Sequence, residues 1–349
     1  MTSNPRLRSA VKLVLVTLTV ALAVPAGTAH AAAAAFVAVD LGTLGGGFSA
    51  AVAVNPGGQV VGLSVTGGPY RRLRAFSWTQ EGGMVDLGAL GGDLSGNSSC
   101  ATAVNPGGQV VGITCNGDYA LGFSWTQEGG MVDLGALGGS GYSVPLAVNP
   151  SGQVVGYSGH PTRAFLWTQD GGMVGLGTLG GHTSAAFAVN ASGAVVGSGA
   201  TSAGGTHAFL WTQDGGMVDL DTLGGTPSGA AAVSPSGQVV GYSYTAGNAA
   251  YHAFSWTQDG GMVDLGTLGG TDSYAVAVNP SGQVVGYSYT AGNAATHAFS
   301  WTQADGMVDL GTLGGSSSAA VAVNASGEVV GHSDTNVGEE HAVLWRPER

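Results

Sequence analysis

The residue types most often used for binding gather in the segments where seven copies of one repeat differ from each other. These segments hold aromatic, cationic and acidic side chains outside the repeat consensus: Tyr70, Arg71, Arg72, Tyr119, Tyr142, His160, His182, Tyr251 and Asp272. Tyr and Arg are enriched where binding energy concentrates. The run Tyr70–Arg72 sets cationic donors beside an aromatic ring, which suits an acidic glycan or an acidic protein loop. The alternative is neutral drift of exposed loops.

Histidines that recur within the repeat are a different case. They occur one per copy, at His207, His252, His297 and His341. A zinc site needs several ligands around one ion, so we expect no metal and no cofactor here. We expect each His to bond locally to a repeated Asp such as Asp219. The Asp spacing of a calcium loop and the motifs G-x-S-x-G and H-E-x-x-H do not occur.

The repeat itself predicts the elements that position these residues. It reads roughly S-A-A-V-A-V-N-P-S-G-Q-V-V-G-Y-S, followed by H-A-F-x-W-T-Q-D-G-G-M-V-D-L-G-T-L-G-G, and its tryptophans recur every 42 to 47 residues. Such self-similarity indicates a solenoid, an array or a propeller. Each copy has four apolar runs separated by turn residues, which predicts four strands, a to d. In the copy around Trp211 these span 185–190, 194–198, 207–212 and 217–223.

Four-stranded units that stack radially predict an all-β, seven-bladed β-propeller over residues 32–349. The chain starts and ends within a repeat. Residues 36–44 match the last strand of a copy, and the final copy, 317–345, lacks that strand. We expect the N- and C-terminal strands to pair and close the ring, which removes two free sheet edges. An open β-solenoid is the alternative, and it would leave both ends uncapped.

Variation among the copies is confined to two of the four connections. The a–b turn, as in 149–152, and the c–d turn, as in 213–216, are nearly invariant, whereas the b–c and d–a connections differ. Because strands alternate in direction, both variable connections should emerge at one end of the ring, where loops commonly carry function. Each copy also has one Trp flanked by Phe or Leu, so we expect all seven in the core.

The sequence of the repeat resembles that of the HAF family of probable extracellular repeat proteins. The resemblance rests on R/H-A-F-x-W, D-L-G-x-L-G-G and G-Q-V-V-G, and it covers residues 36–349. His-Ala-Phe is intact at His207, His252 and His297 and is altered in the other copies, as at Arg74-Ala75-Phe76. The family is known by its repeat rather than by an activity, so the resemblance implies an extracellular location and names no ligand.

The N-terminus predicts secretion. Arg6, Arg8 and Lys12 precede an apolar run over 13–24, and Ala29-His30-Ala31 matches a cleavage pattern, so residues 1–31 are expected to be a signal peptide. The rest has six Arg and Lys against 21 Asp and Glu, a net charge near −15. This charge disfavours nucleic acid and anionic membranes. No other segment could span a bilayer, and we expect a secreted, extracellular monomer.

Two cysteines, Cys100 and Cys115, lie on either side of the turn at 105–108. That turn folds their strands together and brings the thiols within diagonal reach, and an oxidising compartment would favour a disulfide. Two buried thiols are the equally weighted alternative, because diagonal pairs often miss disulfide geometry.

These features favour a secreted, non-catalytic binding or scaffold module that recognises an extracellular polysaccharide or protein. A second hypothesis is a polysaccharide lyase or glycosidase acting at the central channel, which would need convergent carboxylates or histidines. The inner strands offer mainly Ala and Val, and nearby connections offer only Asp93, His182 and Asp272. A third hypothesis is a purely structural extracellular protein.

Overall fold

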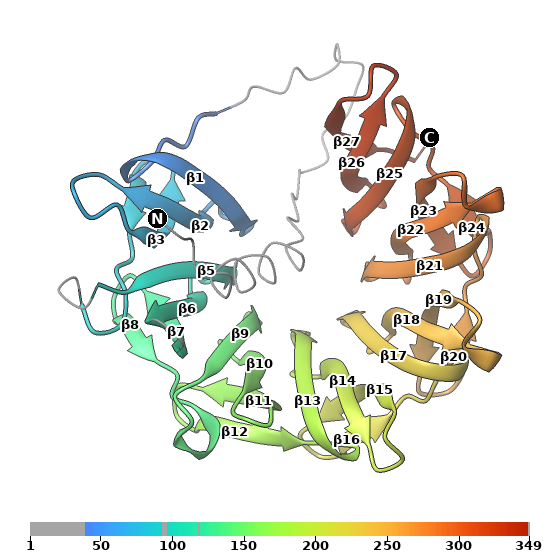
Figure 1. Ribbon diagram of the computed structural model, residues 1–349, viewed down its shortest axis with the longest axis horizontal. Helices are drawn as coiled ribbons and strands as arrows, with labels where there is room; N and C mark the ends of the chain where they lie inside the picture. Colours follow the sequence, from blue (N-terminus) through green and yellow to red (C-terminus); the bar gives the residue numbers. More distant parts are fainter. Residues whose placement is uncertain (1–38, 93–95, 117–118, 348–349) are drawn as a thin grey trace.

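A computed structural model of the chain describes residues 39–92, 96–116 and 119–347. The described chain is all-β and consists of seven antiparallel sheets arranged in a ring (Figure 1). Six sheets have four strands and the last has three. The predicted seven-bladed β-propeller is thereby confirmed. Within the same ranges, no helix is long and apolar enough to cross a membrane.

Each blade is a meander of consecutive strands. The innermost strands are β1 (Gly45–Val54), β5 (Ser98–Val104), β9 (Ser143–Val148), β13 (Gly180–Val189), β17 (Gly224–Val233), β21 (Gly269–Val278) and β25 (Gly314–Val323). The second strands are β2 (Val60–Thr66), β6 (Val110–Asn116), β10 (Val154–Ser158), β14 (Val195–Thr201), β18 (Val239–Thr245), β22 (Val284–Thr290) and β26 (Val329–Thr335).

The third strands are β3 (Leu73–Thr79), β7 (Tyr119–Thr126), β11 (Arg163–Thr168), β15 (Thr206–Thr212), β19 (Tyr251–Thr257), β23 (Thr296–Thr302) and β27 (Glu340–Trp345). The outermost strands are β4 (Gly83–Asp86), β8 (Gly130–Asp133), β12 (Gly172–Gly177), β16 (Gly216–Asp219), β20 (Gly261–Asp264) and β24 (Gly306–Asp309). Three short 3-10 helices lie in connections: η2 (Leu137–Gly139), η3 (Ala246–Asn248) and η4 (Ala291–Asn293).

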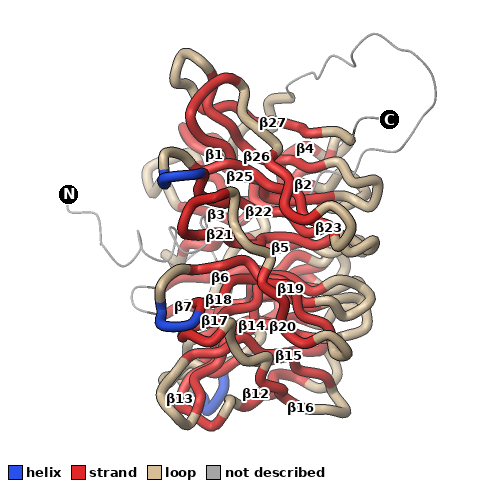
Figure 2. The backbone as a smooth tube through the Cα atoms, turned by 90° about the vertical axis from the view of Figure 1, so that its right-hand side faces the viewer, coloured by secondary structure: helices blue, strands red, loops and turns tan. Residues whose placement is uncertain are grey.

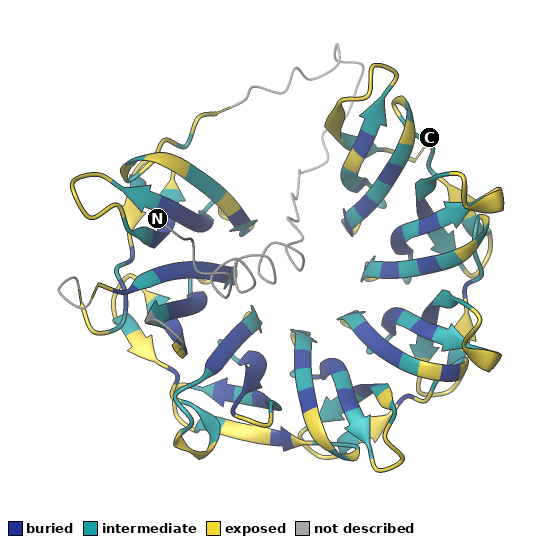
Figure 3. Cartoon of the chain, viewed as in Figure 1, coloured by how far each residue is buried: buried dark blue, intermediate teal, exposed yellow. Residues whose placement is uncertain are grey.

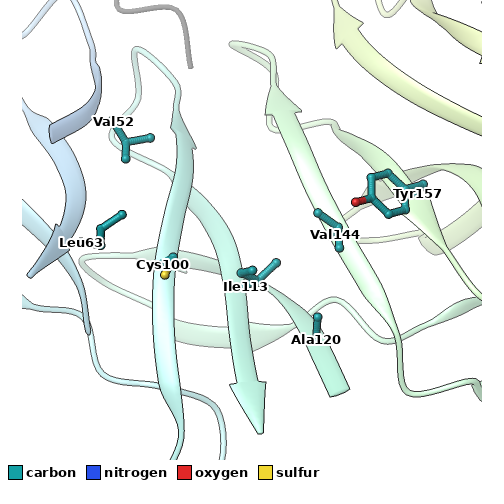
Figure 4. Packing of buried hydrophobic residues seen from close by; sticks show 7 residues of the cluster. All are labelled: Val52, Leu63, Cys100, Ile113, Ala120, Val144 and Tyr157. Atoms are coloured by element: carbon teal, nitrogen blue, oxygen red, sulfur yellow. The ribbon is translucent and has the colours of Figure 1, made fainter. Parts of the chain in front are cut away.

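The core lies between neighbouring blades, and one pattern recurs at each of the six junctions. Between the fourth and fifth blades, for example, Val196, Ala208 and Leu220 of one blade pack against Val239 and Phe254 of the next. Burial is greatest in the second and third strands of the blades, whereas many innermost-strand residues are half-buried and the outermost strands are partly exposed (Figure 3). A further cluster links the first three blades, from Val52 and Leu63 to Tyr157 (Figure 4).

Phenylalanine, rather than tryptophan, fills the centre of five of the six junctions, and the last blade has Val343 at this position. The Phe of the H-A-F motif is at most 1% exposed in six blades, at Phe76, Phe123, Phe165, Phe209, Phe254 and Phe299. A glycine on the second strand makes room for this ring, since a Cβ added at Gly62 would lie 2.9 Å from Phe76 Cε1. The tryptophans pack at the rim of the same clusters, and only Trp167 is buried. The expectation that all seven are core residues is therefore wrong.

The two variable connections of each blade meet at one end of the ring, which we call the variable end. In the first blade, the amide of Gly67, after β2, donates to the carbonyl of Leu44, before β1, over 2.9 Å. The three 3-10 helices, which lie in such connections, all fall on one side of the ring in Figure 2. We call the opposite end, with the a–b and c–d turns, the constant end.

The predicted closing strand is not formed by the described residues. Residues 39–44 lie in no strand, residues 36–38 fall outside the described ranges, and β27 has no outer partner there. The outermost strand ends at an Asp in five blades, as at Asp86 in β4. Asp40 is the equivalent residue, and the same turn follows it, because its Oδ1 accepts from the amide of Gly42 over 2.9 Å as that of Asp86 accepts from Gly88 over 2.8 Å. The expected range therefore included turn residues.

Among the described residues, one face of the last blade is not covered by a neighbouring blade, although the equivalent face is covered in the other blades. Val330 is only half-buried and Ala342 is exposed, whereas their equivalents Val285 and Ala298 are fully buried. The first and last blades stand apart in Figure 1, unlike every other pair of neighbours.

The predicted disulfide is also not formed, and both thiols are free. The register of β5 and β6 sets Cys100 opposite Ile113 and Cys115 opposite Ser98, so the cysteines are diagonal neighbours. Diagonal Cβ atoms are farther apart than the separation that a disulfide requires. Burial raises the pKa of both thiols, that of Cys100 to about 12, so neither is activated as a nucleophile.

Candidate functional site

The structure divides the residues singled out from the sequence into three groups at the variable end. The first group is Tyr70, Arg71 and Arg72 between β2 and β3. The second is Tyr119, Tyr142 and His160, from the second and third blades. The third is Tyr251 and Asp272, from the fifth and sixth blades. His182, on β13, is exposed and belongs to none of these groups.

The first group is a small cationic surface. Tyr70 is 77% exposed, and the guanidinium carbon of Arg72 lies 5.7 Å from the centre of its ring. This separation is within the range of a cation–π contact. The backbone of Arg72 is held by two hydrogen bonds with Thr66, which fixes the base of the loop. Arg71 is exposed beside them.

The second group is an aromatic stack. The rings of Tyr142 and His160 are stacked with centroids 5.0 Å apart, and Tyr142 also contacts Tyr157 at 6.2 Å. Tyr119 lies beside them, because a Cβ added at Gly141 would come within 3.4 Å of its ring. Tyr157 is buried, and burial and the nearby Tyr142 raise its pKa.

The third group belongs to a larger feature that the sequence analysis missed. Six of the ten tyrosines gather where the fifth and sixth blades meet, and we call them the tyrosine cluster: Tyr242, Tyr244, Tyr251, Tyr274, Tyr287 and Tyr289. All six are half-buried. They come from β18, β19, β21 and β22.

A sequence signal for the cluster exists. Two consecutive copies contain Tyr-Ser-Tyr-Thr, at 242–245 and 287–290, where the first copy contains Leu-Ser-Val-Thr. Alternate residues of a strand share a face, so each pair of tyrosines points to the same side. The first tyrosine of each pair matches the repeat consensus and recurs at Tyr157 in the third blade, but the other blades have Leu63, Ile113, Ser198 and His332 at that position.

The rings of the cluster are in direct contact. Tyr244 and Tyr251, paired across β18 and β19, are stacked with centroids 3.8 Å apart. Tyr251 contacts Tyr274 at 5.5 Å, and Tyr274 is stacked on Tyr287 at 5.1 Å. Centroids this close leave no space for ligand atoms between the rings. A ligand would therefore lie on the outer surface of the cluster, as on a platform.

Asp272 is fixed against this platform. Its Oδ1 accepts from the amide of Tyr251 over 2.8 Å, and its Oδ2 accepts from the hydroxyl of Thr271 over 2.6 Å. Burial, neighbouring tyrosines and this carboxylate raise the pKa of Tyr251 to about 12, and burial and Asp272 also raise that of Tyr274. Both phenols are therefore neutral at physiological pH and can donate and accept hydrogen bonds.

Three of the four repeated histidines make the expected contact with a repeated Asp, whereas His341, on the three-stranded last blade, lies 3.5 Å from Glu339 instead. Nδ1 of His207, His252 and His297 lies 2.7–2.9 Å from Asp219, Asp264 and Asp309 respectively. Each pair joins the third and outermost strands of one blade. No group of three potential metal ligands occurs among the residues that the structure describes.

The constant end contains a set of bonds that sequence reasoning also missed. In most blades, the turn Asn accepts from backbone amides through Oδ1, and its Nδ2 donates to the carbonyl of the equivalent residue in the next blade. Asn105 thus donates to Asn149 over 3.0 Å, and Asn149 donates to Asn190 over 3.0 Å. Turn chemistry accounts for the bonds through Oδ1 but not for the bond to the next blade.

No family model and no curated protein matches the chain. Among solved structures, it is similar to an S511A mutant of puromycin hydrolase complexed with PGG (TM-score 0.53, 13% identity, 87% of this chain and 53% of that chain). It is also similar to the β-propeller domain of the Trilobed protease from Pyrococcus furiosus, described with an open velcro topology (TM-score 0.53, 9% identity, 86% of this chain and 97% of that chain). The chain spans about half the length of puromycin hydrolase. At these identities the likeness shows a shared β-propeller fold alone.

Proposed function

We propose that this chain is a secreted, non-catalytic binding module whose variable end contacts an extracellular polysaccharide or protein. One observation carries the proposal. The side chains outside the repeat consensus assemble into contacting groups at the variable end, whereas the constant end repeats one bonding pattern from blade to blade. A rigid scaffold that presents distinct aromatic and charged groups on its loops is a common design of binding proteins.

The chemistry of these groups supports binding over catalysis. General acid–base catalysis needs a group whose pKa lies near the working pH. The pKa values of the Tyr251 and Tyr274 phenols are raised, and so lie further from neutral pH than usual. Both oxygens of Asp272 already accept hydrogen bonds. Tyr rings next to fixed polar groups instead provide contact area with few rotatable bonds.

Charge, motifs and the N-terminal sequence support an extracellular location and limit the class of partner. The acidity of the chain after residue 31 argues against nucleic acid as a partner. The signal-like residues 1–31, which lie outside the described residues, and the resemblance to HAF repeat proteins support an extracellular monomer.

The test is recovery of a partner from the medium in which the protein accumulates. The full chain, expressed with its N-terminus, is collected from culture medium, and its first residue is determined by sequencing. It is then used as bait and as probe on arrays of polysaccharides and proteins. Binding by a protein that begins near residue 32 supports the proposal. A protein retained in the cell, or one that binds nothing on either array, contradicts it.

A further inference from the structure

We infer that the tyrosine cluster is a saccharide-binding platform, and that it takes neutral rather than acidic sugars. The inference deepens the proposed function, on which it rests, by naming the site and the class of ligand. It moves the expected site from the cationic loop at Tyr70 to the junction of the fifth and sixth blades.

The first argument is that tyrosine is an unusual choice for this place. The corresponding two positions of the second strand hold Leu63 and Val65 in the first blade, Ile113 and Cys115 in the second, and Ser198 and Ala200 in the fourth. Outside the fifth and sixth blades, the second strands have a tyrosine at one of these positions in the third blade alone, at Tyr157. Leucine would satisfy packing alone. A half-buried tyrosine adds a polar tip and an exposed edge, which suits a ligand that is itself part apolar and part polar.

The second argument is geometric. A cage for an ammonium group needs aromatic faces that are separated by the cation, but the rings here touch at 3.8–5.6 Å. The cluster can therefore receive a ligand only on its outer surface. The apolar C–H face of a sugar ring lies flat on such a surface, and the neutral phenols can bond the sugar hydroxyls at its edge.

The third argument is electrostatic. Asp272 sets a negative charge beside the rings, and it raises the pKa of Tyr251 and Tyr274 in addition to the effect of burial. A carboxylate accepts hydrogen bonds from sugar hydroxyls, and its oxygens have capacity beyond the two bonds already described. The same charge repels uronic acids and sulfated sugars, so a neutral saccharide fits best.

The repeat supplies a folding-compatible variant for the test. Tyr244 and Tyr251 form a cross-strand pair, and the first blade has Val65 and Leu73 at the same two positions. The double variant Tyr244→Val with Tyr251→Leu therefore installs a pair that this fold already contains. The matched control is the double variant Ala200→Val with Thr206→Leu, which installs the same pair at the equivalent positions of the fourth blade, outside the cluster.

Binding of the full chain is measured by affinity electrophoresis and calorimetry. The neutral probes are β-glucan, mannan and xylan oligomers, and the acidic probes are polygalacturonate and alginate. We expect a neutral probe to bind, with an affinity that changes little between 50 and 500 mM salt because no ion pair is involved. The double variant in the fifth blade should lose about ten-fold or more in affinity, while the control in the fourth blade stays within about two-fold.

The outcomes separate the site from the proposed function. If a neutral probe binds equally well to the double variant, the platform is refuted although the binding function stands. If only acidic probes bind, and Arg71→Ala with Arg72→Ala abolishes that binding, the cationic loop is the site and the inference is wrong. If no saccharide binds but a protein partner is recovered, the ligand class is wrong. Failure of every probe and every pull-down removes the proposed function itself.

Discussion

The two ends of the ring are built from the same seven repeats, yet they use their polar side chains in opposite ways. At the constant end, Asn149 is 1% exposed and all its polar atoms bond within its turn or to the next blade. At the variable end, Tyr251 is half-buried and its ring packs on tyrosines of two blades. The difference teaches that repetition marks stability here, whereas departure from the repeat marks candidate binding residues.

The largest expected effect on stability is in the core between the blades, which both ends of the ring share. Phe209→Ala should destabilise the protein by about 3–5 kcal/mol, because it removes a fully buried ring and leaves a cavity. Trp211→Ala, at the half-buried rim of the same junction, should cost clearly less. Urea unfolding monitored by circular dichroism measures both. Equal losses would show that the rim tryptophans carry as much of the core as the phenylalanines.

The constant end is tested at Asn149. Asn149→Ala should cost roughly 2–3 kcal/mol, because it leaves buried amides and a carbonyl without partners. Asn149→Ser should cost only about 1 kcal/mol, since Ser234 occupies this position in the fifth blade and its hydroxyl accepts from Gln238 over 3.0 Å. Neither change should alter partner binding in a titration. A loss of binding with native stability would refute the division between the two ends.

At the variable end, the pH dependence of the tyrosine cluster offers a smaller effect. A raised tyrosine pKa means that the folded state favours the neutral phenol, so stability is lost as pH rises from the ordinary value near 10 toward 12. Asp272→Asn should lower the pKa of Tyr251 and Tyr274 and reduce this loss. Absorbance titration of the phenolates, compared with the parent, measures the shift. An unchanged titration would mean that burial and the neighbouring tyrosines, without Asp272, set these pKa values.

The smallest effect on stability is expected in the cationic loop. Replacing Tyr70, Arg71 and Arg72 together with Ala should lower the free energy of unfolding by no more than about 1 kcal/mol, because Tyr70 and Arg71 are exposed and only Arg72 is half-buried. The backbone bonds between Arg72 and Thr66 do not depend on these side chains. Thermal melting measures the change. A loss of several degrees would assign the loop a structural role instead of a place on the binding surface.

The architecture could be predicted from the sequence because its information is local and repeated. Turn residues such as Asn149, Pro150 and Gly152 delimit the strands, and the alternation of apolar residues defines their faces. The pairing of His207 with Asp219 also followed, because both residues lie on strands joined by a short turn. Strand boundaries were less exact, as β13 begins at Gly180 rather than at residue 185.

The candidate site was only partly predictable, because it depends on contacts between blades. Tyr251 and Asp272 were both identified, but their hydrogen bond joins two copies of the repeat. The five other tyrosines of the cluster were not identified: two neighbouring copies share four of them in Tyr-Ser-Tyr-Thr, and the fifth, Tyr274, lies on an innermost strand. The Asn-to-carbonyl bonds were missed for the same reason, as the donor and acceptor lie more than 40 residues apart.

The sequence by itself determined the number of blades, the strands within each and which connections vary, because each follows from periodicity and turn chemistry within about 45 residues. Only the tertiary structure decided which residues meet across the junctions. It placed Phe rather than Trp at the centre, left the two thiols diagonal and unpaired, and left the face of Ala342 without the partner blade that covers Ala298. The physical reason is that burial and side-chain contacts depend on how neighbouring sheets stack. The spacing of residues within one repeat does not determine that stacking.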